Sequence, residues 1–148
     1  MKAYRLEEPA MALASDDLAR RGVLSWSMPA GEAERSALID AIKRDHGYVE
    51  ADFVELAPET ENLEVICAKF DKEHYHTEDE VRAVMSGEGI FDVRDEADRW
   101  IRIEVEEGDV IAIPARTHHR FFLTGLKHIR CMRLFANGNG WAPLYRES

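Results

Sequence analysis

The chain has 148 residues, and its 19 basic and 29 acidic side chains give it a net charge of −10 at pH 7. This length fits one domain with a sizeable core, and 45% apolar with 32% charged residues is typical of a globular protein rather than a disordered chain. The acidic charge without a basic cluster argues against a nucleic-acid partner, and no apolar stretch is long enough to span a membrane.

The N-terminal residues lack the apolar region of a secretion signal. Glu7 and Glu8 follow the first basic residues, and the apolar run Ala10–Ala14 is too short for such a region. Cys67 and Cys131 lie in apolar stretches, so we expect free, buried thiols in a reducing compartment. The sequence therefore predicts a cytoplasmic protein without a disulfide.

Two helices are predicted in the first third of the chain. Ser15 is a typical N-cap with acidic residues in the following turn, and the short helix that it begins ends before Gly22. A strand is predicted at Val23–Met28. Apolar residues then recur at helical spacing in Glu32–His46, which predicts a second helix that ends at Gly47.

From about residue 48 the apolar pattern alternates, which is typical of β-strands. Turn residues separate the strands at Ser86–Gly89, Arg94–Ala97 and Glu106–Asp109. The predicted strands are Leu63–Phe70, Val81–Met85, Gly89–Arg94, Trp100–Val105, Val110–Ile113, His119–Thr124 and Ile129–Ala136. Short strands without a helix between them favour antiparallel sheets that form a sandwich or a closed barrel.

The predicted fold class is therefore mainly β, a small antiparallel barrel or jelly roll preceded by two short helices. The sequence contains no internal repeat and no linker rich in Pro or Ser, so we expect one domain over residues 1–148. Its parts are a helical region at about 15–47, a β-barrel at about 48–136 and a C-terminal tail at 137–148.

A first group of chemically active residues begins at His74 and His76. These histidines stand two residues apart, so both imidazoles point to the same face of a strand, and Glu80 and Arg82 keep that parity if the strand resumes after a short turn. Two imidazoles and a carboxylate beside open coordination positions suit Fe(II) and other divalent transition metals in a catalytic site. Without further motifs, a His-x-His pair is more often found on the surface.

A second group surrounds His118 and His119 and supplies those further motifs. The two groups together give the residue order His74, His76, Glu80, Gly87, Gly108, Pro114 and His119. This order resembles the two motifs of the cupin superfamily, small β-barrels that hold a metal ion with three His and one Glu. Two residues depart from the general pattern: Arg116 stands where it has Gly, and Leu123 where it often has Asn. The departure at Arg116 concerns the tight turn before His119 rather than the ligand.

Within the cupins, the chain resembles the acireductone dioxygenase family, oxygen-using enzymes of methionine salvage. The resemblance covers about Leu18–Trp141. It is carried by His74–Arg82, Ser86–Asp95, Trp100–Ile103, Gly108–Asp109, Ile113–Ala115, His119–Phe121, Met132–Phe135 and Trp141. It implies metal ligation by His74, His76, Glu80 and His119, and a catalytic role for Glu80 and Arg82.

The resemblance also implies the reaction. The metal is Fe(II) or Ni(II), one ion per chain, although the ligands also suit Co(II) or Mn(II). The substrates are O2 and acireductone, 1,2-dihydroxy-3-keto-5-methylthiopentene, whose neighbouring oxygens can bind at the open metal positions while Arg82 offsets the negative charge of the enediolate. The iron form gives formate and 2-keto-4-methylthiobutyrate; the nickel form gives formate, carbon monoxide and methylthiopropionate.

Other side chains near these motifs have two interpretations each. Phe70 and Phe121 either wall the substrate pocket or only pack in the core, and Trp141 either closes the pocket or anchors the chain. His118 faces away from His119 on a strand, which places it at the surface or the rim. Arg82 either faces the substrate anion or pairs in solvent with an acid such as Asp79.

Two alternatives to the acireductone reaction stay open. One is another cupin dioxygenase or isomerase with a different small enolic substrate; the other is a cupin that binds metal or ligand without turnover, such as a sensor. Arg82 and the segment Gly87–Asp95 favour the acireductone reading over the first, and the lack of a basic DNA-binding segment weakens the second. We expect a monomer or a small homo-oligomer without nucleic-acid or membrane partners.

Overall fold

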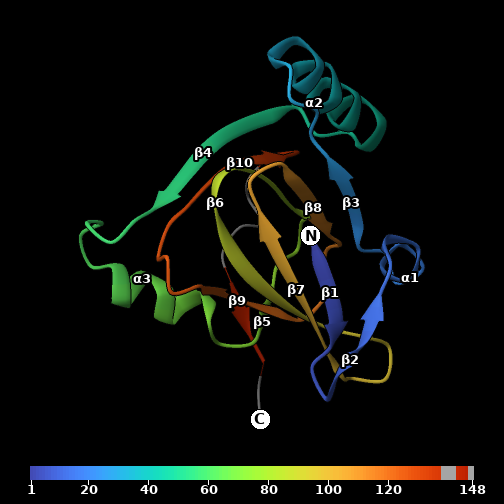
Figure 1. The fold of residues 1–148 in the computed structure, drawn as a ribbon, viewed down its shortest axis with the longest axis vertical. Helices are drawn as coiled ribbons and strands as arrows, with labels where there is room; N and C mark the ends of the chain where they lie inside the picture. The colour runs from blue at the N-terminus through green and yellow to red at the C-terminus, as the bar shows by residue number, and fades with distance from the viewer. Residues whose placement is uncertain (138–142, 147–148) are drawn as a thin grey trace.

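Antiparallel strands dominate the fold, which confirms the mainly β class. The computed structural model describes residues 1–137 and 143–146. Its helices are α1 (Ser15–Ala19), α2 (Glu32–His46) and α3 (Leu63–Phe70). Its strands are β1 (Lys2–Arg5), β2 (Glu8–Leu13), β3 (Leu24–Ser27), β4 (Glu50–Leu56), β5 (His74–Tyr75), β6 (Glu80–Arg94), β7 (Trp100–Glu106), β8 (Asp109–Ile113), β9 (His119–Leu123), β10 (Ile129–Phe135) and β11 (Leu144–Tyr145). The strands curve into a barrel, and α2 and α3 lie outside it (Figure 1).

The long strand β6 joins the two sheets of the barrel. Its first half pairs with β8 and β10, and its second half pairs with β7 and β9. The bend between the halves lies at Gly87, whose φ is +81° and whose missing Cβ would stand 2.1 Å from the carbonyl oxygen of His128. Only glycine fits this backbone conformation and this close approach. The predicted turn at Ser86–Gly89 is therefore wrong: the chain bends there without reversing.

Alternation along β6 places the candidate site inside the barrel. Val81 and Ala83 point outward and are buried beneath Ile39 and Ile42 of α2. Val84 belongs to the inner core, which lies between the sheets and includes residues of β6, β7, β8 and β10. Because side chains alternate between the two faces of a strand, this packing fixes the register of β6, and a slip of one residue would expose the apolar set. The outward face therefore determines which residues point into the barrel.

Helix α3 corrects the strand predicted at Leu63–Phe70. Leu63 and Ile66 stand three residues apart and both pack against the inner core, while Val65 between them is exposed. This is helical spacing, and the β-branched pair Val65 and Ile66 obscured it in the sequence. A helix therefore interrupts the predicted run of strands, immediately before the first histidine motif.

The N-terminal region also differs from the prediction. Two strands, β1 and β2, precede the first helix, and β1 extends the sheet beside β7. Helix α1 is preceded by Ala14, whose N–H donates to the Asp17 carboxylate, so Ser15 is the first helical residue rather than the cap. The second helix is confirmed with its ends, and Gly47 after it has a left-handed φ of 75°.

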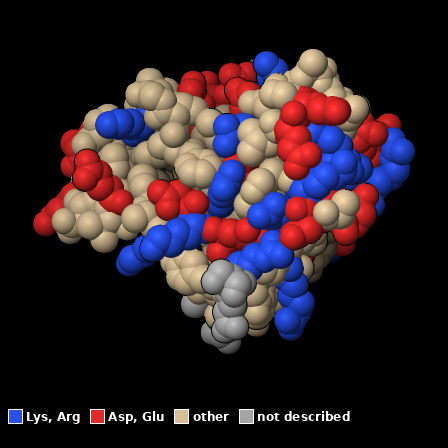
Figure 2. All heavy atoms as spheres, turned by 90° about the horizontal axis from the view of Figure 1, so that it is seen from below, with Lys and Arg blue, Asp and Glu red and all other residues tan. Residues whose placement is uncertain are grey.

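Figure 2 shows basic and acidic side chains interspersed on one face of the molecule, without a continuous basic patch on that face. None of the helices in the described ranges combines the length and apolar character needed to cross a membrane. In these residues both cysteines are free thiols, and Cys67 is only half-buried.

Asp92 near the end of β6 is a fully buried carboxylate between two arginines. It accepts hydrogen bonds from Arg102 Nε and Nη2 at 2.8 and 2.9 Å and from Arg120 Nε at 2.9 Å. We expect Asp92→Asn to lower the free energy of unfolding by about 2–3 kcal/mol, because both guanidinium groups lose a charged acceptor. Urea unfolding measures this, with Asp45→Asn in an exposed pair as the control; a loss below about 0.5 kcal/mol for Asp92→Asn contradicts the prediction.

Candidate metal centre

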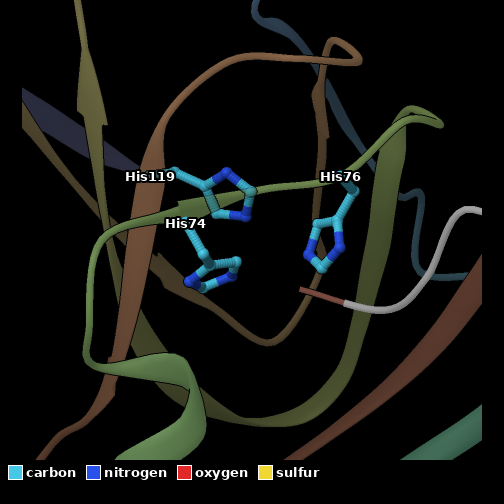
Figure 3. A group of neighbouring side chains, drawn as sticks. All are labelled: His74, His76 and His119. Atoms are coloured by element: carbon cyan, nitrogen blue, oxygen red, sulfur yellow. The ribbon is translucent and has the colours of Figure 1, made fainter. Parts of the chain in front are cut away.

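Three histidines from two segments meet inside the barrel. His74 lies on β5, His76 follows that strand, and His119 begins β9, where it stands directly opposite His74. All three are buried, and their candidate ligand nitrogens lie within 4.8 Å of one another. Figure 3 shows the three rings converging on one space. His74 and His76 were predicted to point to the same face, and their rings do converge on the same space.

Glu80 completes the group. Its Oε2 lies 2.6 Å from Nε2 of His119 and 3.9 Å from Nε2 of His76. Despite the short distance, Glu80 Oε2 and His119 Nε2 are buried atoms without a partner of hydrogen-bond geometry in the described part of the chain. Buried polar atoms normally have partners, so their convergence fits a position for a cation. The residues present therefore suit a divalent metal ion with nitrogen and oxygen ligands.

Backbone carbonyls orient two of the imidazoles. Nδ1 of His74 lies 2.6 Å from the carbonyl oxygen of Lys72, and Nδ1 of His119 lies 2.8 Å from that of Thr117. A carbonyl oxygen can only accept, so each Nδ1 carries a proton, and Nε2 is the ring nitrogen left to bind a metal ion. Such hydrogen bonds fix the tautomer and ring orientation of metal-binding histidines.

Burial and neighbouring charges shift the pKa values of the cluster in different directions. Burial lowers the pKa of His74 to about 4, so its imidazole is neutral at pH 7. Burial by itself would raise the pKa of Glu80, but the neighbouring His119 and Arg82 charges outweigh it and hold that pKa well below its usual value. Burial likewise opposes the charge on His119, yet the Glu80 carboxylate raises the His119 pKa above its usual value. Glu80 is therefore an ionised carboxylate inside the barrel.

Arg82 points into the barrel beside Glu80, as parity predicted. Its Nε and Nη2 donate to Oε1 of Glu80 at 3.2 and 2.9 Å. The alternative pairing with Asp79 is wrong, because Asp79 accepts hydrogen bonds from the Tyr48 hydroxyl at 2.6 Å and from the backbone N–H of Ala115 at 2.8 Å. Arg82 thus contacts a candidate metal ligand, a contact that parity does not reveal.

Backbone contacts hold the two histidine motifs together. The N–H of Arg116 donates to the carbonyl oxygen of His76 at 2.8 Å, next to the Ala115–Asp79 hydrogen bond. Arg116 itself has a φ of +67°, the left-handed conformation that glycine usually supplies. The tight turn before His119 is therefore kept although Arg116 replaces glycine.

His118 lies on the other side of the strand from the cluster. Its Nδ1 is 3.3 Å from Oε2 of Glu73, and its ring packs against Tyr75. The rim position predicted for His118 agrees with this geometry.

The cluster lines a pocket of about 220 Å³. Phe70 and Phe121 both line it, as does Arg82; Trp141 lies outside the described residues. Sequence reasoning missed a further wall, made of Val54 and Leu56 from β4 and Ile129, Cys131 and Arg133 from β10. Each set repeats every second residue, and this alternation was the signal that could have found them.

A larger and more open hollow of about 840 Å³ lies elsewhere, lined by Arg94, Asp98, His118 and Arg146 among others. None of the four candidate ligands lines it. Arg94 and Arg146 bind Glu73 and Asp98 there, so their charges are compensated. All four candidate ligands line the smaller pocket instead.

Comparison with known proteins decides the family. The sequence model of the ARD/ARD' family matches residues 3–143. The chain belongs to the ARD/ARD' family. Among the acireductone dioxygenases that it resembles, the one from Heterostelium pallidum is 40% identical over 149 residues, with 99% of each chain covered. The acireductone dioxygenase 1 of Physcomitrium patens is 40% identical over 139 residues, covering 93% of this chain and 72% of the relative.

A solved member of the ARD/ARD' family has the same fold. The acireductone dioxygenase from Bacillus anthracis, with a cadmium ion in its active centre, is 28% identical and covers 97% of both chains with a TM-score of 0.87. This agreement confirms the predicted cupin-type barrel.

Proposed function

We propose that this chain is an acireductone dioxygenase that holds one divalent metal ion with His74, His76, Glu80 and His119. The observation that carries the proposal is the buried convergence of these four side chains in a chain of the ARD/ARD' family. The relatives named as acireductone dioxygenases and the cadmium ion of the Bacillus anthracis enzyme support it. The proposal includes a cytoplasmic location, because the free thiols of Cys67 and Cys131 fit a reducing compartment.

The donor set suits Fe(II), Ni(II), Co(II) or Mn(II), since imidazoles and a carboxylate bind all of these ions. When bound, the ion supplies a Lewis-acid centre for the neighbouring oxygens of an enediolate and for the activation of O2. The chain's own contribution is the ligand geometry, with two tautomers set by the carbonyl oxygens of Lys72 and Thr117.

Arg82 and the apolar wall act on the substrate itself. The Arg82 guanidinium lines the pocket beside Glu80, where it can offset the negative charge of an enediolate next to the carboxylate. Phe70 and Phe121 provide apolar surface for a thioether tail and exclude water from the reacting end. A pocket that combines charged groups with apolar walls suits a small enolic anion with an apolar substituent.

Oxygen consumption tests the activity. Protein of measured metal content is mixed with acireductone, and oxygen uptake above the uncatalysed rate is expected in proportion to the bound metal. The same protein stripped with a chelator is the control. Uptake by neither sample contradicts the dioxygenase and favours a cupin that binds without turnover, whereas uptake only with other enediols favours a different substrate.

Metal identity sets the products in this proposal. The Irving–Williams order makes the site bind nickel more tightly than iron, so metal supply determines the occupant. Stripped protein reloaded with Fe(II) is expected to yield formate and 2-keto-4-methylthiobutyrate, and protein reloaded with Ni(II) formate, carbon monoxide and methylthiopropionate. Chromatography of the acids and headspace analysis of the gas measure this. Identical products from both forms contradict the metal-dependent part.

A further inference from the structure

The C-terminal arm, residues 143–146, forms one side of the strand that carries His74. Its strand β11 pairs with β5, with Tyr145 opposite His74 and Leu144 opposite Tyr75. On its other side, β5 pairs with β9, where His74 stands opposite His119. The short histidine strand is thus held between β9 and the arm.

The arm also reaches the pocket and helix α3. Pro143 lines the same pocket as the four candidate metal ligands. The Tyr145 hydroxyl donates to the carbonyl oxygen of Lys69 at 3.0 Å, and the Tyr145 ring lies 6.1 Å from the ring of His74. The position of the arm therefore affects both the wall of the pocket and the surroundings of His74.

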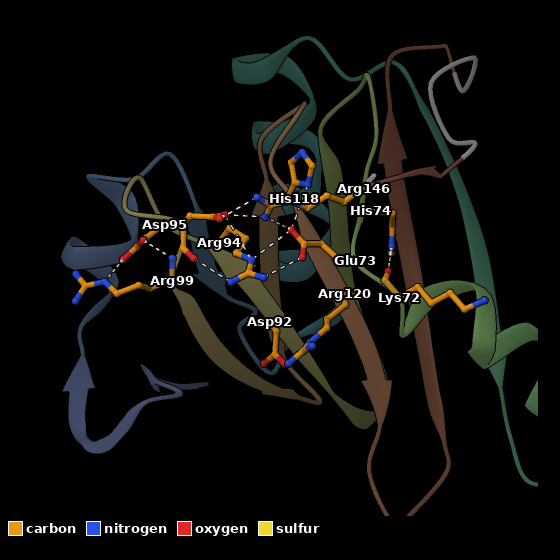
Figure 4. Close-up of polar contacts among 11 residues, drawn as sticks. Lys72, Glu73, His74, Asp92, Arg94, Asp95, Arg99, His118, Arg120 and Arg146 are labelled. Atoms are coloured by element: carbon orange, nitrogen blue, oxygen red, sulfur yellow. Dashed lines mark hydrogen bonds and ion pairs between the residues drawn. The ribbon is translucent and has the colours of Figure 1, made fainter. Parts of the chain in front are cut away.

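Arg146 binds two carboxylates at the end of the arm. Its Nη1 donates to Oε2 of Glu73 at 2.7 Å, and Nη1 and Nη2 donate to the two oxygens of Asp98 at 2.8 Å each. Its backbone N–H donates to the carbonyl oxygen of Glu73 at 3.2 Å. Figure 4 shows Arg146, Arg94 and His118 gathered around Glu73, the residue directly before His74.

Glu73 is itself fixed from the opposite side. Arg94 of β6 donates to it through Nε at 3.2 Å and Nη2 at 3.0 Å. Glu73 is therefore anchored to the barrel, and Arg146 attaches the arm to that anchor. A strand of two residues offers few hydrogen bonds of its own, whereas an arginine shared by two carboxylates gives charge-assisted contacts of defined geometry.

We propose that Arg146 is a positioning residue of the metal pocket: by binding Glu73 and Asp98 together, it holds the C-terminal arm against β5 and thereby keeps His74 and Pro143 in place. The effect on substrate rests on the proposed activity and the effect on metal binding on the proposed ligand set, whereas the effect on the backbone rests on neither. The competing view is that Arg146 makes an ordinary surface ion pair, which contributes little.

The first test needs no enzymatic activity. We expect Arg146→Gln to speed amide hydrogen exchange at least about tenfold in residues 143–146 and in residues 72–76, with no change in β7, because loss of the clamp opens the edge of β5. The dissociation constant of Ni²⁺, titrated into the stripped protein, is expected to rise about threefold to tenfold. Arg44→Gln, which removes an exposed arginine paired with Asp45, is the matched control and should change neither quantity.

Faster exchange in the arm alone, with residues 72–76 and the Ni²⁺ affinity unchanged, overturns the proposal, because Arg146 then only holds the chain end. Unchanged exchange in the arm overturns it as well. The melting temperatures of the variant and the parent protein should agree within about 2 °C, which shows that the barrel itself is intact.

The second test uses turnover with acireductone. Arg146→Gln is expected to raise KM about threefold to tenfold at saturating metal while kcat changes less than about twofold, because the pocket wall is altered but the reacting groups remain. Arg146→Lys keeps the positive charge but not the forked guanidinium group, so its KM should lie between those of Arg146→Gln and the parent protein. An unchanged KM in Arg146→Gln overturns the role in the pocket. If the parent protein shows no oxygen uptake, the proposed function fails, and the exchange and Ni²⁺ measurements still decide the role of Arg146.

Discussion

Replacing His119 with alanine is expected to weaken Ni²⁺ binding by at least about 100-fold, whereas replacing His118 with alanine should change it less than about twofold. His119 is buried, its Nδ1 is held by the Thr117 carbonyl, and its Nε2 faces Glu80 at 2.6 Å. His118, the preceding residue, pairs with Glu73 on the other side of the strand. Adjacent histidines therefore have different expected effects, because neighbouring side chains of a strand point to opposite faces.

Competition with a chromophoric chelator measures both affinities, and circular dichroism checks that each variant is folded. The two substitutions remove the same side chain from neighbouring positions, so each is the control for the other. Loss of Ni²⁺ binding in His118→Ala with normal binding in His119→Ala would mean that the register of β9 differs from the one described. Normal binding in both would remove His119 from the ligand set.

The arrangement of the histidines follows from local rules that the sequence displays. His74 and His76 share parity, Glu80 and Arg82 share it again, and outward burial of Val81 beneath α2 fixes which face is inside. The pocket wall on β10 obeys the same alternation. The alternation itself was predictable, because the side-chain period of a strand does not depend on distant parts of the chain; the packing of Val81 beneath α2 was not.

Other features depend on contacts that no local pattern encodes. Gly87 bends β6 instead of ending it because the two halves find different partner strands, and this is a tertiary choice. Leu63–Phe70 forms a helix because Leu63 and Ile66 meet the core, against the β preference of Val65 and Ile66. The contact of Arg146 with Glu73 spans a sequence separation of 73 residues. Pairings at that distance appear only once the sheet order is known.

Replacing Arg82 with alanine is expected to lower kcat/KM for acireductone by at least about 100-fold, the usual loss when one preorganised donor to a developing negative charge is removed. The alternation of side chains along the strand predicts that Arg82 acts on the substrate and that its loss leaves metal binding unchanged. The hydrogen bonds from Nε and Nη2 to Oε1 of Glu80 add a second effect, because the buried Glu80 carboxylate loses its cationic partner.

Metal affinity separates the two effects of Arg82. We expect Ni²⁺ binding to Arg82→Ala to weaken about tenfold, as for partners that orient a ligand, so the activity is measured at saturating metal. Arg82→Lys retains the charge without the fork and should recover more metal affinity than activity. Arg130→Ala is the matched control, since that arginine of β10 lies over the exposed Phe53 ring outside the pocket. Activity close to that of the parent protein in metal-saturated Arg82→Ala would show that Arg82 serves Glu80 alone. The charge of the enediolate would then have to be offset by another group of the pocket. Arg133 is the nearest candidate by register, since it lies directly opposite Arg82 across β6 and β10.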